Sequence, residues 1–182
     1  DQVVLRDHPA QIWQRPPQHS PATCRVGFLG LGETGCRVPL ALAGHGLDVA
    51  GWSRTPRRLP GIQAHDGEAG LDTLLARTDI LVNLLPLTAR TRGILGAETF
   101  AKLPQGAALI NVGRGDHLVP ADLIQALDAG HLRGAVLDVF AHEPLDRADP
   151  LWTHPRVLVT PHMAAIARDE AVIGQIVANA WR

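Results

Sequence analysis

Three side chains suited to the chemistry of a small carboxylic acid follow separate apolar runs of the sequence. Arg114 stands between two glycines in NVGRG, and its planar guanidinium matches a carboxylate. His162 follows the last apolar run, and histidine is the side chain that most readily exchanges a proton near neutral pH. Glu143 precedes Pro144, where it could orient the His162 ring and favour its charged form, or could simply occupy a turn. Together these residues predict carboxylate binding beside proton transfer.

Histidine is common in this chain, which has nine, so only its place after a predicted strand distinguishes His162. We interpret the other eight as surface or loop residues: His8, His19, His45, His65, His117, His131, His142 and His154. The sequence has no HExxH pattern and no paired cysteines, and it therefore predicts no metal site.

A glycine-rich turn, GLGETG, lies between an apolar run and a segment with helical spacing. In this GxGxxG pattern Gly30 allows a tight turn, Gly32 lets the backbone approach a pyrophosphate, and Gly35 allows close helix–strand packing. Free N–H groups at the start of the helix favour phosphate binding. The turn predicts a dinucleotide site, with a purely structural turn as the alternative. The predicted contacts are Gly30, Leu31, Gly32, Glu33, Thr34 and Gly35.

The end of the next apolar run bears on which dinucleotide would bind. NAD enzymes usually carry an acidic residue there, which accepts from the ribose 2′-OH. This chain has Trp52, Ser53 and Arg54 instead. Ser53 and Arg54 could hydrogen-bond a 2′-phosphate, and each bond to a charged group contributes about 1.5–3 kcal/mol. We therefore expect NADP(H) to be preferred, with NAD(H) possible; a solvated basic loop is the alternative.

The elements that must position these residues alternate between buried strands and helices. Strands that are apolar throughout are expected to be buried on both faces and parallel. The predicted fold is therefore an α/β, Rossmann-type doubly wound parallel sheet with helices on both faces, whose ligands gather beyond the carboxyl ends of the strands. Predicted strands span residues 25–30, 48–53, 79–85, 106–112, 132–139 and 156–160, and predicted helices 35–45, 70–77, 97–103 and 120–129.

Composition excludes several other classes of protein. The 182 residues are 46% hydrophobic and 19% charged, which argues against intrinsic disorder. A net charge of -1 argues against a general nucleic-acid or anionic-membrane binder, and no apolar run approaches the roughly 18 residues of a membrane span. The sequence shows no secretion signal, and its two cysteines, Cys24 and Cys36, form no disulfide framework, so we expect a cytoplasmic protein.

The two ends of the chain suggest connections to another domain. Residues 1–22 are expected to form a polar connecting helix followed by a Pro-rich linker, and residues 23–165 the dinucleotide-binding domain. Residues 166–182 have helical apolar spacing without a capping residue at the end. A helix with an apolar stripe needs a surface to pack on, which suggests a further domain.

The motifs resemble the cofactor domain of the D-isomer-specific 2-hydroxyacid dehydrogenases, and within them the glyoxylate/hydroxypyruvate reductases. Matching blocks cover about residues 24–167 and include VGFLGLGETG, GWSRT, LVNLLPLTARTRGIL, LINVGRGDHLV, GAVLDVFAHEPL and PLWTHPRVLVTPHMAA. The resemblance implies hydride transfer from NADPH to a 2-oxoacid, a homodimer, and a separate substrate domain that this sequence lacks. Without that domain the cleft has one wall, and we expect the chain to bind NADP(H) but to turn over poorly.

The resemblance also implies roles for single residues. Arg114 would bind the carboxylate and carbonyl of the 2-oxoacid, His162 would protonate the carbonyl oxygen, and Glu143 would orient and charge His162. One departure is Gly113, where the family often has Ala or Ser, and this glycine is expected to loosen the loop. The remaining implied contacts are Leu84, Leu85 and Pro86 on the adenosine side with Thr91 nearby, and Val112 and Asp138 at the nicotinamide.

Two other functions remain open on the sequence. The β-hydroxyacid dehydrogenases share a similar glycine loop and NADP strand, but they use a catalytic lysine in a following helical domain, and this chain has little lysine. A regulatory dinucleotide-binding module related to the C-terminal-binding-protein corepressors would keep similar motifs. Turnover of 2-oxoacids with NADPH would distinguish an enzyme from such a module.

Overall fold

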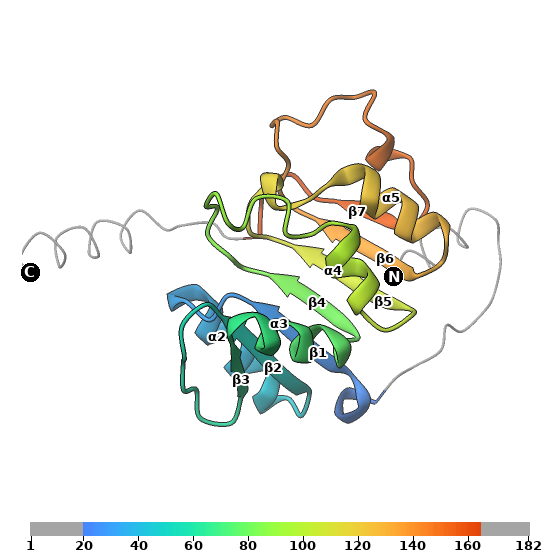
Figure 1. Cartoon of the computed structure of the whole chain (residues 1–182). Helices are drawn as coiled ribbons and strands as arrows, with labels where there is room; N and C mark the ends of the chain where they lie inside the picture. Colours follow the sequence, from blue (N-terminus) through green and yellow to red (C-terminus); the bar gives the residue numbers. More distant parts are fainter. Residues whose placement is uncertain (1–19, 165–182) are drawn as a thin grey trace, which may run out of the picture.

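The computed structural model describes residues 20–164, in which one parallel sheet carries helices on both faces (Figure 1). Neighbouring strands follow the order β3-β2-β1-β4-β5-β6-β7. The strands are β1 (Arg25–Leu29), β2 (Asp48–Ser53), β3 (Gln63–Asp66), β4 (Ile80–Asn83), β5 (Ala107–Asn111), β6 (Leu132–Leu137) and β7 (Val157–Val159). The helices are α2 (Glu33–Gly44), α3 (Gly67–Ala76), α4 (Ala97–Lys102) and α5 (Pro120–Asp128), with short 3₁₀ turns η1 (Pro21–Thr23), η2 (Gly115–His117) and η3 (Pro150–Trp152).

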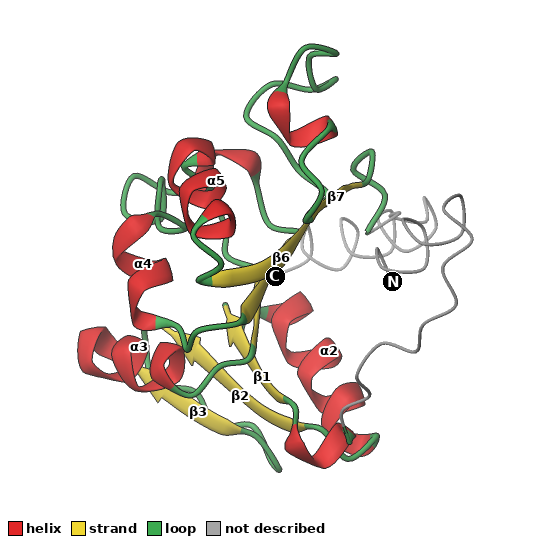
Figure 2. Ribbon diagram, turned by 90° about the vertical axis from the view of Figure 1, so that its right-hand side faces the viewer, coloured by secondary structure: helices red, strands yellow, loops and turns green. Residues whose placement is uncertain are grey.

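The core lies on both faces of the sheet. Helix α2 covers one face, whereas α3, α4 and α5 lie on the other (Figure 2). Buried leucines form the larger cluster, in which Leu109 of β5 packs with Leu74 of α3 and Leu123 of α5. A smaller cluster joins Phe28 of β1 to Leu42 of α2. The apolar runs thus form the sheet because its strands bury side chains against two helical layers.

The predicted doubly wound α/β fold is confirmed, since every strand pairing is parallel and all six predicted strands are present. Strand β3 was not predicted, because QAHD has no apolar run; it forms at the sheet edge by pairing with β2. The expected burial on both faces is found for β1 and β4 at the centre, apart from their half-buried first residues. It is wrong for β2, β5, β6 and β7, each of which has half-buried or exposed residues.

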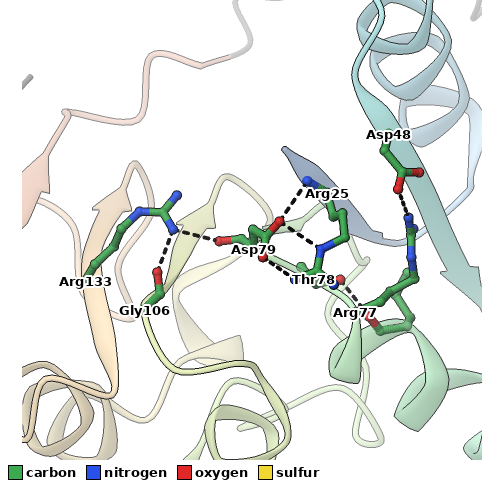
Figure 3. Close-up of polar contacts among 8 residues, drawn as sticks. Arg25, Asp48, Arg77, Thr78, Asp79, Gly106 and Arg133 are labelled. Atoms are coloured by element: carbon green, nitrogen blue, oxygen red, sulfur yellow. Dashed lines mark hydrogen bonds and ion pairs between the residues drawn. The ribbon is translucent and has the colours of Figure 1, made fainter. Parts of the chain in front are cut away.

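Polar contacts connect the amino-terminal ends of several strands (Figure 3). These ends lie opposite the loops at the carboxyl ends of the strands. Arg25 donates from Nη2 to Asp79 Oδ1 at 2.6 Å and from Nε to Asp79 Oδ2 at 2.9 Å. Arg133 donates to the carbonyl oxygens of Asp79 and Gly106, at 3.3 and 2.5 Å. The starts of β1, β4, β5 and β6 are therefore tied together. The Arg25 hydrogen bonds outweigh partial burial and lower the pKa of Asp79.

Within residues 20–164, none of the helices is long and apolar enough to cross a membrane. The expected polar helix and most of the linker in residues 1–22, and the expected helix of residues 166–182, lie outside the described residues.

Candidate functional site

The glycine turn after β1 has the geometry that dinucleotide binding requires. Gly30 has a φ of 103°, a conformation that side chains disfavour. A Cβ on Gly35 would lie 2.0 Å from the Gly30 carbonyl oxygen, so helix α2 packs directly on the turn. A Cβ on Gly32 would meet nothing within 4 Å, which leaves open space beside the start of the helix. The residues present therefore fit a pyrophosphate at the N-terminus of α2.

The predicted contacts around this turn differ in what they can offer. The backbone of Glu33 and Thr34 opens α2. Leu31 is buried, and a Cβ on Gly51 would lie 2.4 Å from its Cδ2 atom, so its side chain belongs to the core. A nucleotide could meet Leu31 only through its backbone.

The loop after β2 is basic and exposed. Ser53 Oγ donates to the Thr55 carbonyl oxygen at 2.7 Å, which keeps its lone pairs available as acceptors but commits its proton. Trp52 Nε1 donates to the Gly67 carbonyl oxygen at 2.7 Å, and Arg54 is exposed. A hollow of about 430 Å³ adjoins this loop; its lining is Arg57, Arg58, Leu59, Pro60, Ile62 and Ala64. Arg57 and Arg58 are thus further anion-binding candidates that the sequence analysis did not single out.

The loop after β4 meets the glycine turn at the point where the strand order reverses. A Cβ on Gly30 would lie 3.0 Å from the Leu84 carbonyl group. Leu84 is half-buried and Leu85 is buried, whereas Pro86 is exposed. Thr91 Oγ1 donates to the Pro86 carbonyl oxygen at 2.8 Å and so stabilises the turn. This junction is the topological switch point, where doubly wound sheets bind ligands.

The loop after β5 carries Arg114, which is exposed. Within the described residues its guanidinium makes one hydrogen bond, from Nη1 to the Gly113 carbonyl oxygen at 2.6 Å. Val112 is half-buried. Gly113, which was expected to loosen the loop, is buried, and its N–H donates to Asn111 Oδ1 at 3.2 Å. A Cβ on Gly113 would lie 2.7 Å from Asn83 Nδ2, so the glycine admits close polar packing.

The Arg114 loop packs against the loop after β6. A Cβ on Gly115 would lie 1.8 Å from the Phe140 carbonyl carbon and 2.2 Å from the Ala141 nitrogen. The Phe140 N–H donates in turn to Glu143 Oε1 at 2.9 Å. The backbone next to Arg114 therefore touches the turn that holds Glu143.

Glu143 and His162 form a direct pair. His162 Nδ1 lies 2.7 Å from Glu143 Oε2, and the two side chains are 49% and 35% exposed. The His162 hydrogen bond is the largest cause that lowers the pKa of Glu143, followed by the Phe140 N–H bond. The sequence left the role of Glu143 open, and the structure brings it to His162. Because Nδ1 faces the carboxylate, Nε2 is the ring nitrogen left for another partner.

Asp138 organises the backbone on either side of His162. His162 has a φ of 50°, uncommon for a residue other than glycine. Its N–H donates to the Asp138 carbonyl oxygen at 2.9 Å, and the N–H groups of Met163 and Ala164 donate to the Asp138 carboxylate, each at 2.9 Å. Burial raises the pKa of Asp138, but hydrogen bonds from Thr160, Ala164 and Met163 outweigh it and lower the pKa. Asp138 thus holds the His162 turn in addition to any cofactor contact.

The interpretation of His117 as a surface or loop residue is wrong. It lies in η2 and is fully buried. Its Nδ1 accepts from the Arg114 N–H at 3.2 Å and lies 2.8 Å from Asn83 Nδ2. The sequence signal that could have indicated it is the asparagine that ends each of two neighbouring strands, ILVN and AALIN, because a buried polar side chain there needs a partner.

Residues 20–164 contain no cluster of three or more His, Cys, Asp or Glu side chains that could hold a metal ion.

Comparison with known proteins connects this geometry to a family. A model described as "D-isomer specific 2-hydroxyacid dehydrogenase, NAD binding domain" matches residues 4–164. Glyoxylate/hydroxypyruvate reductase A of Salmonella paratyphi B is 42% identical over 165 residues, which are 91% of this chain and 53% of that protein. This chain therefore spans about half the length of the curated relatives it matches.

Solved structures agree with this result. A D-isomer specific 2-hydroxyacid dehydrogenase from Xanthobacter autotrophicus Py2, in complex with NADPH and MES, superimposes with a TM-score of 0.94 at 46% identity, covering 100% of this chain and 75% of that one. An NADPH-dependent glyoxylate/hydroxypyruvate reductase from Sinorhizobium meliloti, in complex with NADP and sulfate, has a TM-score of 0.89 at 41% identity, covering 98% and 57%.

Proposed function

This chain belongs to the D-isomer specific 2-hydroxyacid dehydrogenase family, whose NAD-binding domain it matches, and this confirms the family that the sequence motifs indicated. We propose that it forms the cofactor-binding half of an NADPH-dependent reductase that converts glyoxylate, hydroxypyruvate or a similar small 2-oxoacid to the D-2-hydroxyacid. The observation that carries this proposal is the 2.7 Å contact between His162 Nδ1 and Glu143 Oε2. The turn that holds Glu143 also packs against the Arg114 loop.

The proposed roles follow from this arrangement. When bound, the nicotinamide supplies a hydride to the carbonyl carbon of the 2-oxoacid. Glu143 accepts from His162 Nδ1 and stabilises the charged ring, so that Nε2 carries the proton taken up by the carbonyl oxygen. Arg114 binds the carboxylate by exchanging its hydrogen bond to the Gly113 carbonyl oxygen for a two-pronged contact. In this proposal Arg114 and His162 are catalytic residues.

NADPH is the proposed cofactor. Gly30, Gly32 and Gly35 form the pyrophosphate turn, and the basic loop after β2 lacks the carboxylate that would repel a 2′-phosphate. The relatives from X. autotrophicus and S. meliloti are described in complex with NADPH and with NADP, which supports the same preference. Proposed further contacts are Leu31, Glu33, Thr34, Trp52, Ser53, Arg54, Leu84, Leu85, Pro86, Thr91, Val112, Gly113 and Asp138.

The 182-residue chain by itself is proposed to bind NADPH and to turn over 2-oxoacids poorly. His162 is 49% exposed and Glu143 35% exposed, so water reaches the groups that would exchange the proton. Reduction of a carbonyl needs oriented reactants and exclusion of water. A homodimer and a cytoplasmic location stay predictions, which sedimentation and cell fractionation would measure.

The test is NADPH oxidation by the longest product of the gene that encodes this chain, with glyoxylate and hydroxypyruvate as substrates. Turnover that is lost in Arg114→Gln and His162→Gln, with NADPH still bound, supports the reductase. Binding of NADPH without turnover of any 2-oxoacid would favour a regulatory nucleotide-binding module.

A further inference from the structure

His117 connects a buried polar network to the backbone of Arg114. The ring is fully buried three residues after Arg114, and its Nδ1 accepts from the Arg114 N–H at 3.2 Å. The same nitrogen lies 2.8 Å from Asn83 Nδ2. An amide N–H and a side-chain NH₂ group therefore both converge on one lone pair of the ring.

Two asparagines complete this network. Asn83 and Asn111 are opposite each other at the ends of β4 and β5, and both are fully buried. Asn83 Nδ2 donates to Asn111 Oδ1 at 2.9 Å, and Asn111 Nδ2 donates to the Arg114 carbonyl oxygen at 3.2 Å. The N–H and the carbonyl of Arg114 are thus both held by side chains rooted in the sheet or in η2.

The network requires a neutral His117 ring. Both neighbours of Nδ1 are donors, so this nitrogen can only accept, and the ring proton belongs on Nε2. Burial is the largest cause that lowers the pKa of His117, and the Arg114 charge lowers it further, against the opposing effects of the Pro86 backbone and Asp116. No hydrogen bond of ordinary geometry reaches Nε2 from the described residues.

We propose that His117 is a positioning residue for 2-oxoacid binding, which fixes the backbone of Arg114 so that the guanidinium meets the substrate carboxylate. This inference rests on the proposed function. Arg114 is exposed, and among residues 20–164 its guanidinium contacts the Gly113 carbonyl oxygen alone, so its backbone bonds are what define its position. A side chain on a freely moving loop would spend binding energy on ordering.

Kinetics of the longest gene product separate this role from a merely structural one. His117→Leu removes the acceptor at similar volume, and His117→Asn keeps one, because its Oδ1 occupies about the place of Nδ1. We expect His117→Leu to raise KM for glyoxylate about tenfold with an unchanged Kd for NADPH, and His117→Asn to stay within about threefold of the parent protein. His131→Leu is the matched control, since it loses a ring bond to the Phe100 carbonyl oxygen, and His131 follows α5 in the chain whereas His117 precedes it.

Two results would overturn the inference. One is that His117→Leu changes KM no more than His131→Leu does. The other is that, in both His117 variants, the rise in KM and the weakening of NADPH binding follow the loss of stability in urea.

Amide hydrogen exchange in the 182-residue chain distinguishes failure of this inference from failure of the proposed function. The Arg114 N–H should exchange at least about tenfold faster in His117→Leu than in His131→Leu or His117→Asn. If the protein reduces no 2-oxoacid but this difference is present, the proposed function is wrong and the local contact is real. An unchanged Arg114 exchange rate would rule out the positioning role.

Discussion

Gly115 lies so close to the backbone of Phe140 that a Cβ on Gly115 would sit 1.8 Å from the Phe140 carbonyl carbon. This contact directly links the loop after β5 to the loop after β6. Because Phe140 also donates to Glu143, the distance between Arg114 and the Glu143–His162 pair depends on a residue without a side chain.

Gly115→Ala should therefore force the two loops apart. We expect the free energy of unfolding to fall by about 1–3 kcal/mol, as overpacking usually costs, together with loss of 2-oxoacid turnover. Urea unfolding of the chain and NADPH oxidation by the longest gene product measure the two effects. Gly44→Ala is the control, because a Cβ there would meet nothing within 4 Å. Equal urea midpoints for the two variants would show that the loops tolerate the side chain.

His162→Gln and Glu143→Gln should differ in degree. His162→Gln removes the proposed proton donor and should lower kcat about 10²–10⁴-fold, the usual contribution of general acid catalysis. Glu143→Gln keeps a hydrogen-bond acceptor without the charge, so we expect a smaller loss. Steady-state kinetics on the longest gene product checks this order, with the exposed Glu68→Gln as the control. A larger loss in Glu143→Gln would contradict the assignment of the proton to His162.

The basic loop after β2 should determine cofactor preference. Arg54→Ala removes a proposed 2′-phosphate contact, and we expect the Kd for NADPH to rise about tenfold or more with little change for NADH. Isothermal titration of the 182-residue chain measures both constants. Arg147→Ala, an exposed arginine in the loop after β6, is the matched control. If Arg54→Ala weakens both cofactors equally, the loop acts only as a general positive surface.

Substitution of Gly32 and of Gly35 should affect different properties of the protein. A Cβ on Gly35 would lie 2.0 Å from the Gly30 carbonyl oxygen, so Gly35→Ala should lower stability by about 1–3 kcal/mol. A Cβ on Gly32 would meet nothing, so Gly32→Ala should fold normally and yet bind NADPH much more weakly. Thermal unfolding with and without NADPH separates the two. Normal NADPH affinity in Gly32→Ala would mean that the nucleotide does not approach this turn.

Asp79→Asn should lower the stability of the fold in a pH-dependent way, because it removes a contact between the amino-terminal ends of β1 and β4. The Arg25 hydrogen bonds lower the Asp79 pKa, so the pair stabilises the fold above the ordinary value of 3.8, and this contribution is lost as pH falls through the lower folded-state value. At neutral pH we expect a loss of about 1 kcal/mol, since Arg25 is partly exposed. Urea unfolding at neutral and acid pH tests this; a difference that persists at the acid end would contradict it.

The sequence predicted the sheet well because apolar runs and helical spacing report burial directly. It missed β3, whose residues QAHD are held by pairing at an edge rather than by apolar contact. It also left Glu143 undecided, because no sequence pattern reports that turns 19 residues apart bring two side chains to 2.7 Å.

His117 was missed for another physical reason. No sequence pattern distinguishes His117 from the other eight histidines, and it becomes buried only when the ends of β4 and β5 lie side by side. The geometry of the glycine turn, in contrast, was predicted correctly, because each glycine meets a local steric requirement that follows from the GxGxxG spacing.

The order of strands divides the molecule into two functional halves. The loops proposed to grip the nucleotide phosphates follow β1 and β2, whereas the residues proposed to handle the oxoacid follow β5, β6 and β7. A change of coenzyme and a change of reactivity can therefore be engineered separately, since β4 separates the strands that carry the two sets of loops.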